Sequence, residues 1–176
     1  TEPTGWPASM VGIPYDALDN WRSVYPTETF VAQMQKVADG FAAGCELLQK
    51  AVAVSKGKYR KQLTDDLGRA RTVGIHCASS ANQARFTEAR NRLLTSTDRD
   101  ERRRYIDTMR RAAEAEAELT ADLLPIVRND PTIGYESSNH YFYVPQDLLE
   151  KQLNIRYVLD WLDRQAEPRN SETSQQ

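Results

Sequence analysis

Hydrophobic residues recur every three or four positions along four long segments of the chain, which is the spacing of a helix that buries one face. The first segment opens at Thr27, an N-cap candidate after Pro26, and ends at Gly57. Its apolar stripe consists of Phe30, Met34, Val37, Phe41, Cys45 (or Gly44), Leu48 and Val52. We expect this stripe to face the interior of a helical bundle.

The second segment, residues 58–95, has small residues in the middle of its stripe. The stripe runs through Tyr59, Leu63, Leu67, Ala70, Gly74, Ala78, Ala81 and Leu93. Small side chains let neighbouring helices approach closely, which predicts that this helix is the central one. Gly68 and Gly74 each disfavour a helix by about 1 kcal/mol relative to alanine, and close packing would offset that penalty.

The third and fourth segments complete the pattern. Residues 95–98 form a polar turn that offers an N-cap, and a helix follows over residues 98–128, with Pro125 expected to bend its last turns. The last helix begins at Pro145, reaches about Arg164 and carries Leu148, Leu149, Leu153, Ile155, Tyr157, Leu159 and Leu162. Short turns favour antiparallel neighbours, so the sequence predicts an all-α, up-down four-helix bundle over residues 27–166.

Prolines and polar residues mark the remaining parts of the chain. Residues 1–26 are rich in proline and aromatic residues, so we expect an irregular lead segment that packs on the bundle, with a short helical turn at residues 15–21. Residues 131–146 form a long loop before the last helix. The polar tail, residues 167–176, is expected to be disordered.

Composition narrows the classes of function. The 176 residues include 23 Lys or Arg and 25 Asp or Glu, interleaved along the helices, which argues against the clustered basic face of a nucleic-acid-binding protein. No segment approaches the roughly 20 apolar residues that a membrane-spanning helix needs. The chain opens with Thr1 rather than Met, which predicts a processed protein or an excised domain.

The two cysteines, Cys45 and Cys77, fall on the first two predicted helices. In a hairpin that turns near Gly57, they would lie about nine residues, or roughly 13 Å, apart along the helix axis. A disulfide requires Cα atoms within about 7 Å. We therefore expect two free, buried thiols.

The sequence contains no motif for nucleotide binding, zinc hydrolysis or serine hydrolysis, and its only histidines are His76 and His140. It also has no Glu-x-x-His pair of the kind that holds two metal ions in a helical bundle. We therefore predict no metal site and no cofactor. His76 adjoins Cys77, but neighbouring helical residues do not face each other, so we interpret His76 as a hydrogen-bonded helix residue.

The most unusual stretch is the polar-aromatic part of the loop before the last helix. It contains Tyr135, Glu136, Asn139, His140, Tyr141 and Tyr143. Flat rings and hydrogen-bonding side chains are what a sugar or another polar ligand requires. The same polar groups could instead satisfy the backbone of a loop that crosses the end of a bundle. A ligand or partner contact and a structural role both stay open at this stage.

Trp6 and Trp21 stand out in the lead segment. Together with the neighbouring tyrosines, they either clasp the bundle or form an interface with another domain or protein.

Residues 133–143, which read Ile-Gly-Tyr-Glu-Ser-Ser-Asn-His-Tyr-Phe-Tyr, are followed by Pro145 and by residues 147–154 of the last helix. This pattern resembles the C-terminal helical part of large bacterial proteins related to glycoside hydrolases. Residues 12–16, Trp21-Arg22 and Tyr25-Pro26 are similar to the entry into that region. The resemblance implies a carbohydrate substrate class, a location outside the cytoplasm, and catalytic carboxylates in a preceding barrel domain. It carries no catalytic residue over to this chain.

Three hypotheses about function follow. The first, which we favour, is a non-catalytic accessory or structural domain of an exported carbohydrate-processing protein, with a catalytic domain of the same polypeptide and carbohydrate as partners. The second is a stand-alone enzyme with its site at residues 131–146, where Glu136 or His140 acts as acid or base beside a second carboxylate such as Asp16 or Asp19. The third is a helical protein-interaction module.

Overall fold

The computed structural model describes residues 17–133, 135–136, 140–141 and 143–166, and of residues 20–21, 135–136, 140–141 and 166 it describes only the backbone. Within this part of the chain the elements are α1 (Leu18–Trp21), α2 (Thr27–Val54), α3 (Gly57–Thr95), α4 (Arg99–Asn129), β1 (Tyr135–Glu136), β2 (His140–Tyr141) and α5 (Pro145–Ala166). The two short strands form an antiparallel hairpin, in which Glu136 lies opposite His140. The described chain is otherwise helical, as predicted.

Local chemistry explains where the long helices begin. Pro26 directly precedes α2, so Thr27 is the first helical residue and not the cap, and its hydroxyl lies 3.4 Å from Glu88 on α3. Gly57 adopts a φ of 55° at the turn between α2 and α3, a conformation that favours glycine. Asp98 caps α4, because its carboxylate accepts a hydrogen bond from the Glu101 amide at 2.8 Å.

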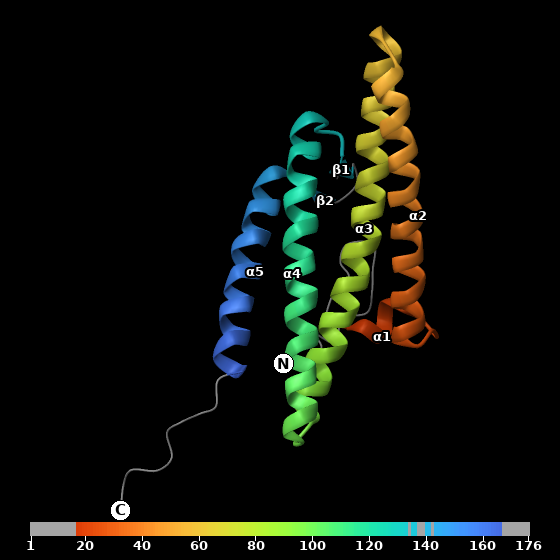
Figure 1. Ribbon diagram of the computed structural model, residues 1–176. Coiled ribbons are helices and arrows are strands. Elements are labelled where there is room, and N and C mark those ends of the chain that lie inside the picture. Colours follow the sequence, from red (N-terminus) through yellow and green to blue (C-terminus); the bar gives the residue numbers. More distant parts are fainter. Residues whose placement is uncertain (1–16, 134, 137–139, 142, 167–176) are drawn as a thin grey trace, which may run out of the picture.

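Consecutive long helices run antiparallel and pack on their neighbours in the chain (Figure 1). α3 contacts α2 on one side and α4 on the other, while α5 packs on the far side of α4. α3 therefore lies in the interior of the row, as its small residues predict, and α4 shares that interior position. α2 and α5 lie at opposite edges, so the described helices form an open array, and the predicted up-down bundle arrangement is not confirmed.

Gly74 accounts for the close approach of α2 and α3. A Cβ atom at this position would lie 3.1 Å from the Cβ of Phe41 and 3.7 Å from the carbonyl oxygen of Ala38. A Cβ at Gly68 would make only an ordinary contact, 3.5 Å from a methyl group of Ile126. The spacing of the two helices therefore depends on Gly74 and not on Gly68.

The core consists of two apolar clusters. One joins α3, α4 and α5 through Ala89, Leu93, Ile106, Met109 and Leu162, and the other contains Leu123, Val127 and Leu148. Some residues of the predicted stripes lie outside the core: Val37 is 43% exposed and Tyr59 is 63% exposed. The reason is the open arrangement, since α2 is an edge helix and the tip of the α2–α3 hairpin extends beyond the other helices (Figure 1).

Both cysteines are free, as predicted, although only Cys45 is fully buried. Among the described helices, none combines the length and the apolar character needed to cross a membrane.

Candidate functional site

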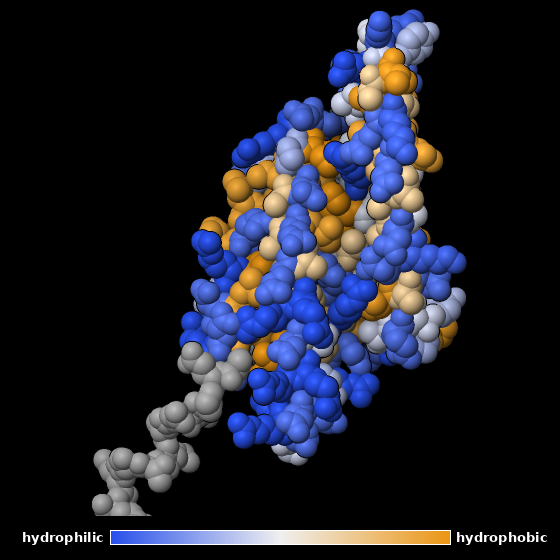
Figure 2. Space-filling view, in the orientation of Figure 1, coloured by the Kyte–Doolittle hydropathy of each residue, from blue (hydrophilic) through white to orange (hydrophobic). Residues whose placement is uncertain are grey.

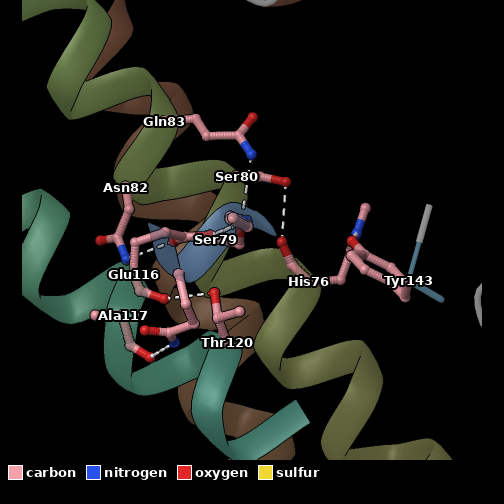
Figure 3. A network of polar contacts seen from close by, with 11 residues as sticks. His76, Ser79, Ser80, Asn82, Gln83, Glu116, Ala117, Thr120 and Tyr143 are labelled. Carbon is pink, nitrogen blue, oxygen red and sulfur yellow. Dashed lines mark hydrogen bonds and ion pairs between the residues drawn. The ribbon is translucent and has the colours of Figure 1, made fainter. Parts of the chain in front are cut away.

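A buried polar cluster lies where α3, α4 and α5 meet (Figure 3). Glu116 of α4 is 7% exposed, and its carboxylate accepts hydrogen bonds from Ser79 at 2.5 Å and from Asn82 at 3.2 Å. Ser79 and Asn82 are three positions apart on α3 and therefore share a face of that helix. Lys151 of α5 forms an ion pair with the same carboxylate, and its ammonium lies 3.5 Å from the Ser79 hydroxyl.

The contacts continue across the molecule to α2. Arg85 donates hydrogen bonds at 3.1 Å to the side-chain oxygen of Asn82 and, also at 3.1 Å, to that of Gln35 on α2. Gln152 of α5 donates to the carbonyl oxygen of Ala117 at 2.6 Å. Polar contacts thus connect all four long helices. Such a network fixes the relative position of helices, because a shift of any one would leave buried polar groups unpaired.

A cavity of about 220 Å³ adjoins this cluster. Its walls are mainly apolar, and they include Phe86, Ala112, Ile155 and Val158, with Glu116 and Lys151 at one side. A serine close to a lysine and a carboxylate suggests nucleophilic chemistry at first sight. Here, however, the Ser79 hydroxyl donates to Glu116, and Lys151 is the charged partner of that carboxylate. The three groups are committed to one another, which favours a structural role.

The polar-aromatic loop predicted as a site is described only in part. Asn139 lies outside the described residues, and Tyr135, Glu136, His140 and Tyr141 are described by their backbone in the β1–β2 hairpin. Their assignment as ligand or partner contacts therefore stays a prediction.

Tyr143, at the end of this loop, is described in full. Its hydroxyl pairs with Nδ1 of His76 on α3, and the two rings meet edge to face with centroids 5.9 Å apart (Figure 3). This contact confirms the interpretation of His76 as a hydrogen-bonded helix residue. It also anchors the chain between β2 and α5 to the central helix.

The structure describes the side chain of neither tryptophan that was predicted as a contact residue. Trp6 is outside the described residues, and Trp21 is described only by its backbone, in α1. The beginning of α1 is buried, with Leu18 4% exposed, and this short helix packs on α3.

A larger groove opens between α2 and α4, with α3 as its floor (Figure 2). It encloses about 710 Å³. The floor and lower walls are formed by small or apolar residues, namely Ala38, Phe41, Ala42, Gly74, Ala78 and Ile126. Three carboxylates line it, Asp39 and Glu46 from α2 and Asp122 from α4, together with one guanidinium, that of Arg71. This groove exists because α2 and α4 both pack on α3 and leave the position between them open.

The outer face of α5 carries a second apolar surface, which we call the α5 stripe: Leu149, Leu153, Tyr157 and Trp161. These residues follow each other at intervals of four and are 47%, 69%, 67% and 37% exposed, respectively. Figure 2 shows apolar side chains gathered over this helix. Leu149, Leu153 and Tyr157 belong to the apolar residues of the predicted last helix, and they lie on its exposed face.

The signal for two faces was present in the sequence. Leu148, Ile155 and Leu162 recur at intervals of seven and pack inwards, whereas the α5 stripe recurs at intervals of four on the other side of the helix. An edge helix buries only the face that meets its neighbour, and periodicity alone does not identify which of two apolar faces that is.

The pKa values of Cys77 and Asp130 are among those that depart from their ordinary range. Burial raises the pKa of the Cys77 thiol, which disfavours the reactive thiolate. The pKa of Asp130 is lowered by hydrogen bonds from the hydroxyl and the backbone amide of Thr132, and to a smaller extent by Arg69. Within the described residues no group of His, Cys, Asp and Glu side chains could hold a metal ion.

Comparison of the chain with protein families, with curated proteins and with solved structures gives no match. The predicted relation to glycoside-hydrolase-related proteins is thus neither supported nor contradicted, and function has to be argued from the geometry.

Proposed function

We propose that this chain is a non-catalytic helical docking module, and that the groove between α2 and α4 receives a helix. The observation that carries this proposal is the groove itself, an open hollow of about 710 Å³ with an apolar floor and charged rims. α2, α3 and α4 supply three helices around it. A fourth helix laid into the groove would complete the up-down bundle that the sequence predicts.

The dimensions of the groove suit an α-helix. Its lining on α2 extends from Gln35 to Gln49, a difference of 14 residues, or about 21 Å at 1.5 Å per residue. That length corresponds to roughly four helical turns. Alanines and Gly74 on the walls and floor leave room for a close approach, which is how helices with small interface residues pack.

The charges suggest what flanks the apolar face of the docked helix. The groove presents three carboxylates against one guanidinium. A partner helix with arginine or lysine beside its apolar stripe would complement these rims, and charge complementarity of this kind favours specificity and fast association.

The non-catalytic part of the proposal is supported by the buried polar cluster. Ser79, Glu116 and Lys151 are held by one another, so none of them is poised for proton transfer. Among the described residues that line the groove, Cys45 is a nucleophile, but no histidine lies beside it to act as a base.

The test is a selection for helices that bind the groove. A display library of helical peptides of about four turns, with variable apolar and flanking positions, would be selected against the chain. We expect enrichment of peptides with apolar residues at intervals of three or four and basic flanks. Ala42→Arg, which fills the groove, should weaken their binding at least about tenfold.

Ala43→Arg is the matched control, since Ala43 is also exposed on α2 but does not line the groove. It should bind the selected peptides as the wild type does. Equal binding by Ala42→Arg, or no enrichment at all, would contradict the docking function.

The carbohydrate-processing context is a second part of the proposal and rests on the sequence resemblance alone. In that context this chain would be an accessory domain beside a catalytic domain of the same polypeptide, outside the cytoplasm. A nuclear magnetic resonance titration with a panel of soluble hexasaccharides tests the direct contact. Shifts confined to residues 135–143 would support a sugar-binding loop. An unchanged spectrum across the panel would contradict sugar binding by these residues.

A further inference from the structure

We propose that the helix that occupies the groove is α5 of a second copy of this chain, inserted by the α5 stripe. This inference rests on the proposed docking function, because it names the occupant of the same groove.

The chain carries two exposed features of matching shape. One is the groove, and the other is a helix whose outer face has an unbroken row of large apolar side chains. The α5 stripe extends from Leu149 to Trp161, a difference of 12 residues, or about 18 Å along the helix. The groove lining on α2 extends over about 21 Å. A helix and a groove of nearly equal length can bury one another along their whole contact.

The placement of α5 favours a second molecule over the same chain. α5 lies at the edge of the array, on the opposite side of α4 from α2 (Figure 1). Its buried residues Leu148, Ile155 and Leu162 hold it on the rest of the fold, so the α5 stripe points away from its own molecule. In Figure 2 the apolar surface over α5 and the hollow beside α2 are separate regions. One copy therefore cannot fill its own groove without unpacking α5.

Two arginines of α5 have nearly the same spacing as two carboxylates on the rim of the groove. Arg156 and Arg164 are exposed on α5, eight residues or about 12 Å apart. The carboxylates Asp39 and Glu46 on the α2 rim are seven residues or about 10.5 Å apart.

Four acidic residues lie on α5, of which Asp147 precedes the α5 stripe in the sequence. Asp163 pairs with Arg110 of its own chain at 2.5 Å, which reduces its repulsion of the acidic rims. Glu150 and Asp160 are exposed on α5, about 15 Å apart along the helix, and Arg71 in the groove offers a charge of opposite sign to one of them. The exposed apolar side chains include one tyrosine and one tryptophan, residue types that often contribute most of the binding energy at an interface.

This contact joins two different surfaces, so each copy offers both a groove and a stripe. Two copies can exchange helices reciprocally, or several copies can join head to tail. In either arrangement each contact needs one intact groove and one intact stripe.

That requirement gives the experiment, performed on the full chain by analytical ultracentrifugation and by co-purification of two differently tagged versions. Wild type is expected to self-associate. Leu153→Glu, which disables the stripe, and Ala42→Arg, which blocks the groove, should each raise the dissociation constant by about thirtyfold or more, as loss of a central anchor does. Leu153→Met and Ala43→Arg are the controls and should behave as wild type. Both altered positions are exposed, and circular dichroism verifies that each variant is folded.

The decisive sample is a mixture of Leu153→Glu with Ala42→Arg. The first variant keeps an intact groove and the second keeps an intact stripe, so the mixture should form a mixed complex although neither variant associates alone. Association of Ala42→Arg by itself would indicate contact between two stripes and overturn the proposal. A mixture that stays monomeric would overturn it too.

A wild-type chain that is monomeric at every concentration would overturn self-association but leave the groove without an assigned partner. The peptide selection then separates the two failures. Enriched peptides whose binding is lost in Ala42→Arg would support docking at the groove. If no such peptides are enriched, both self-association and the docking function are excluded.

Discussion

Glu116 shows how a single buried charge ties the elements of this protein together. Its carboxylate accepts hydrogen bonds from Ser79 and Asn82 of α3 and forms an ion pair with Lys151 of α5. Taking an ionised carboxylate out of water costs several kcal/mol unless a countercharge and hydrogen bonds compensate. The ion pair therefore contributes mainly by specifying one arrangement of the three helices. The free energy of unfolding should fall most when only one of the two partners is removed.

Replacing Lys151 with methionine preserves the aliphatic stem and removes the countercharge. We expect the free energy of unfolding near neutral pH to fall by about 2 kcal/mol, less than for a fully buried pair because the Lys151 side chain is 32% exposed. Urea denaturation measures this change. The double variant Glu116→Leu/Lys151→Met should recover part of the loss, since no unpaired charge remains buried. A single variant as stable as wild type would show that the pair has no role in stability.

Asp130 makes the stability of the folded protein depend on pH in the acidic range. Hydrogen bonds from Thr132, with the nearby Arg69, lower its pKa in the folded protein below the ordinary value of 3.8. A group with a depressed folded pKa contributes stability above its unfolded pKa and loses that contribution as pH falls through the folded pKa. Asp130→Ala should therefore be less stable than wild type at about pH 7, and the difference should be smaller at about pH 2, below the ordinary pKa of the group. Urea midpoints at the two pH values measure this, and a pH-independent difference would contradict it.

At the scale of elements, the packing of helix on helix is governed by which small residue lies at the contact. The two glycines of α3 that the sequence singled out are not equivalent, because only Gly74 lies against the backbone region of α2. Gly44 on α2 is different again, since a Cβ there would meet nothing within 4 Å. The same substitution should therefore have opposite effects at two positions.

Gly44→Ala should raise the free energy of unfolding by up to about 1 kcal/mol, the difference in helix propensity. Gly74→Ala gains the same propensity but places a methyl group 3.1 Å from the Cβ of Phe41, so that α2 and α3 must separate. We expect its melting temperature to lie below that of Gly44→Ala and below that of wild type. If the two variants were equally stabilised, Gly74 would not set the spacing of the helices.

At the scale of the whole molecule, the order of helices in the chain becomes their order in space. Each long helix packs on its predecessor, and the last one continues the row on α4 without turning back towards α2. The groove and the α5 stripe are both consequences of this open arrangement. Docking at the groove and association through α5 are therefore proposals about how the molecule completes an apolar interior that the described part of the chain leaves open.

The sequence alone determined the helices and the interior position of α3. Pro26, Gly57, Asp98 and Pro145 mark helix ends through local backbone chemistry, which acts over a few residues and can be read without knowing the fold. The small residues around Gly74 likewise predicted close packing. These features depend on the identity of neighbouring residues and on a regular period, so they can be predicted from the sequence.

Only the tertiary structure decided which residues of different helices meet. Ser79, Asn82 and Lys151 lie 37, 34 and 35 positions from Glu116, and no period links them. Leu148 and Leu149 are equally apolar neighbours, yet the first is buried and the second is 47% exposed. A helix with two apolar faces buries the face that packs against its neighbour. For α5 this is the face on α4, and the position of α4 is not encoded in the sequence of α5.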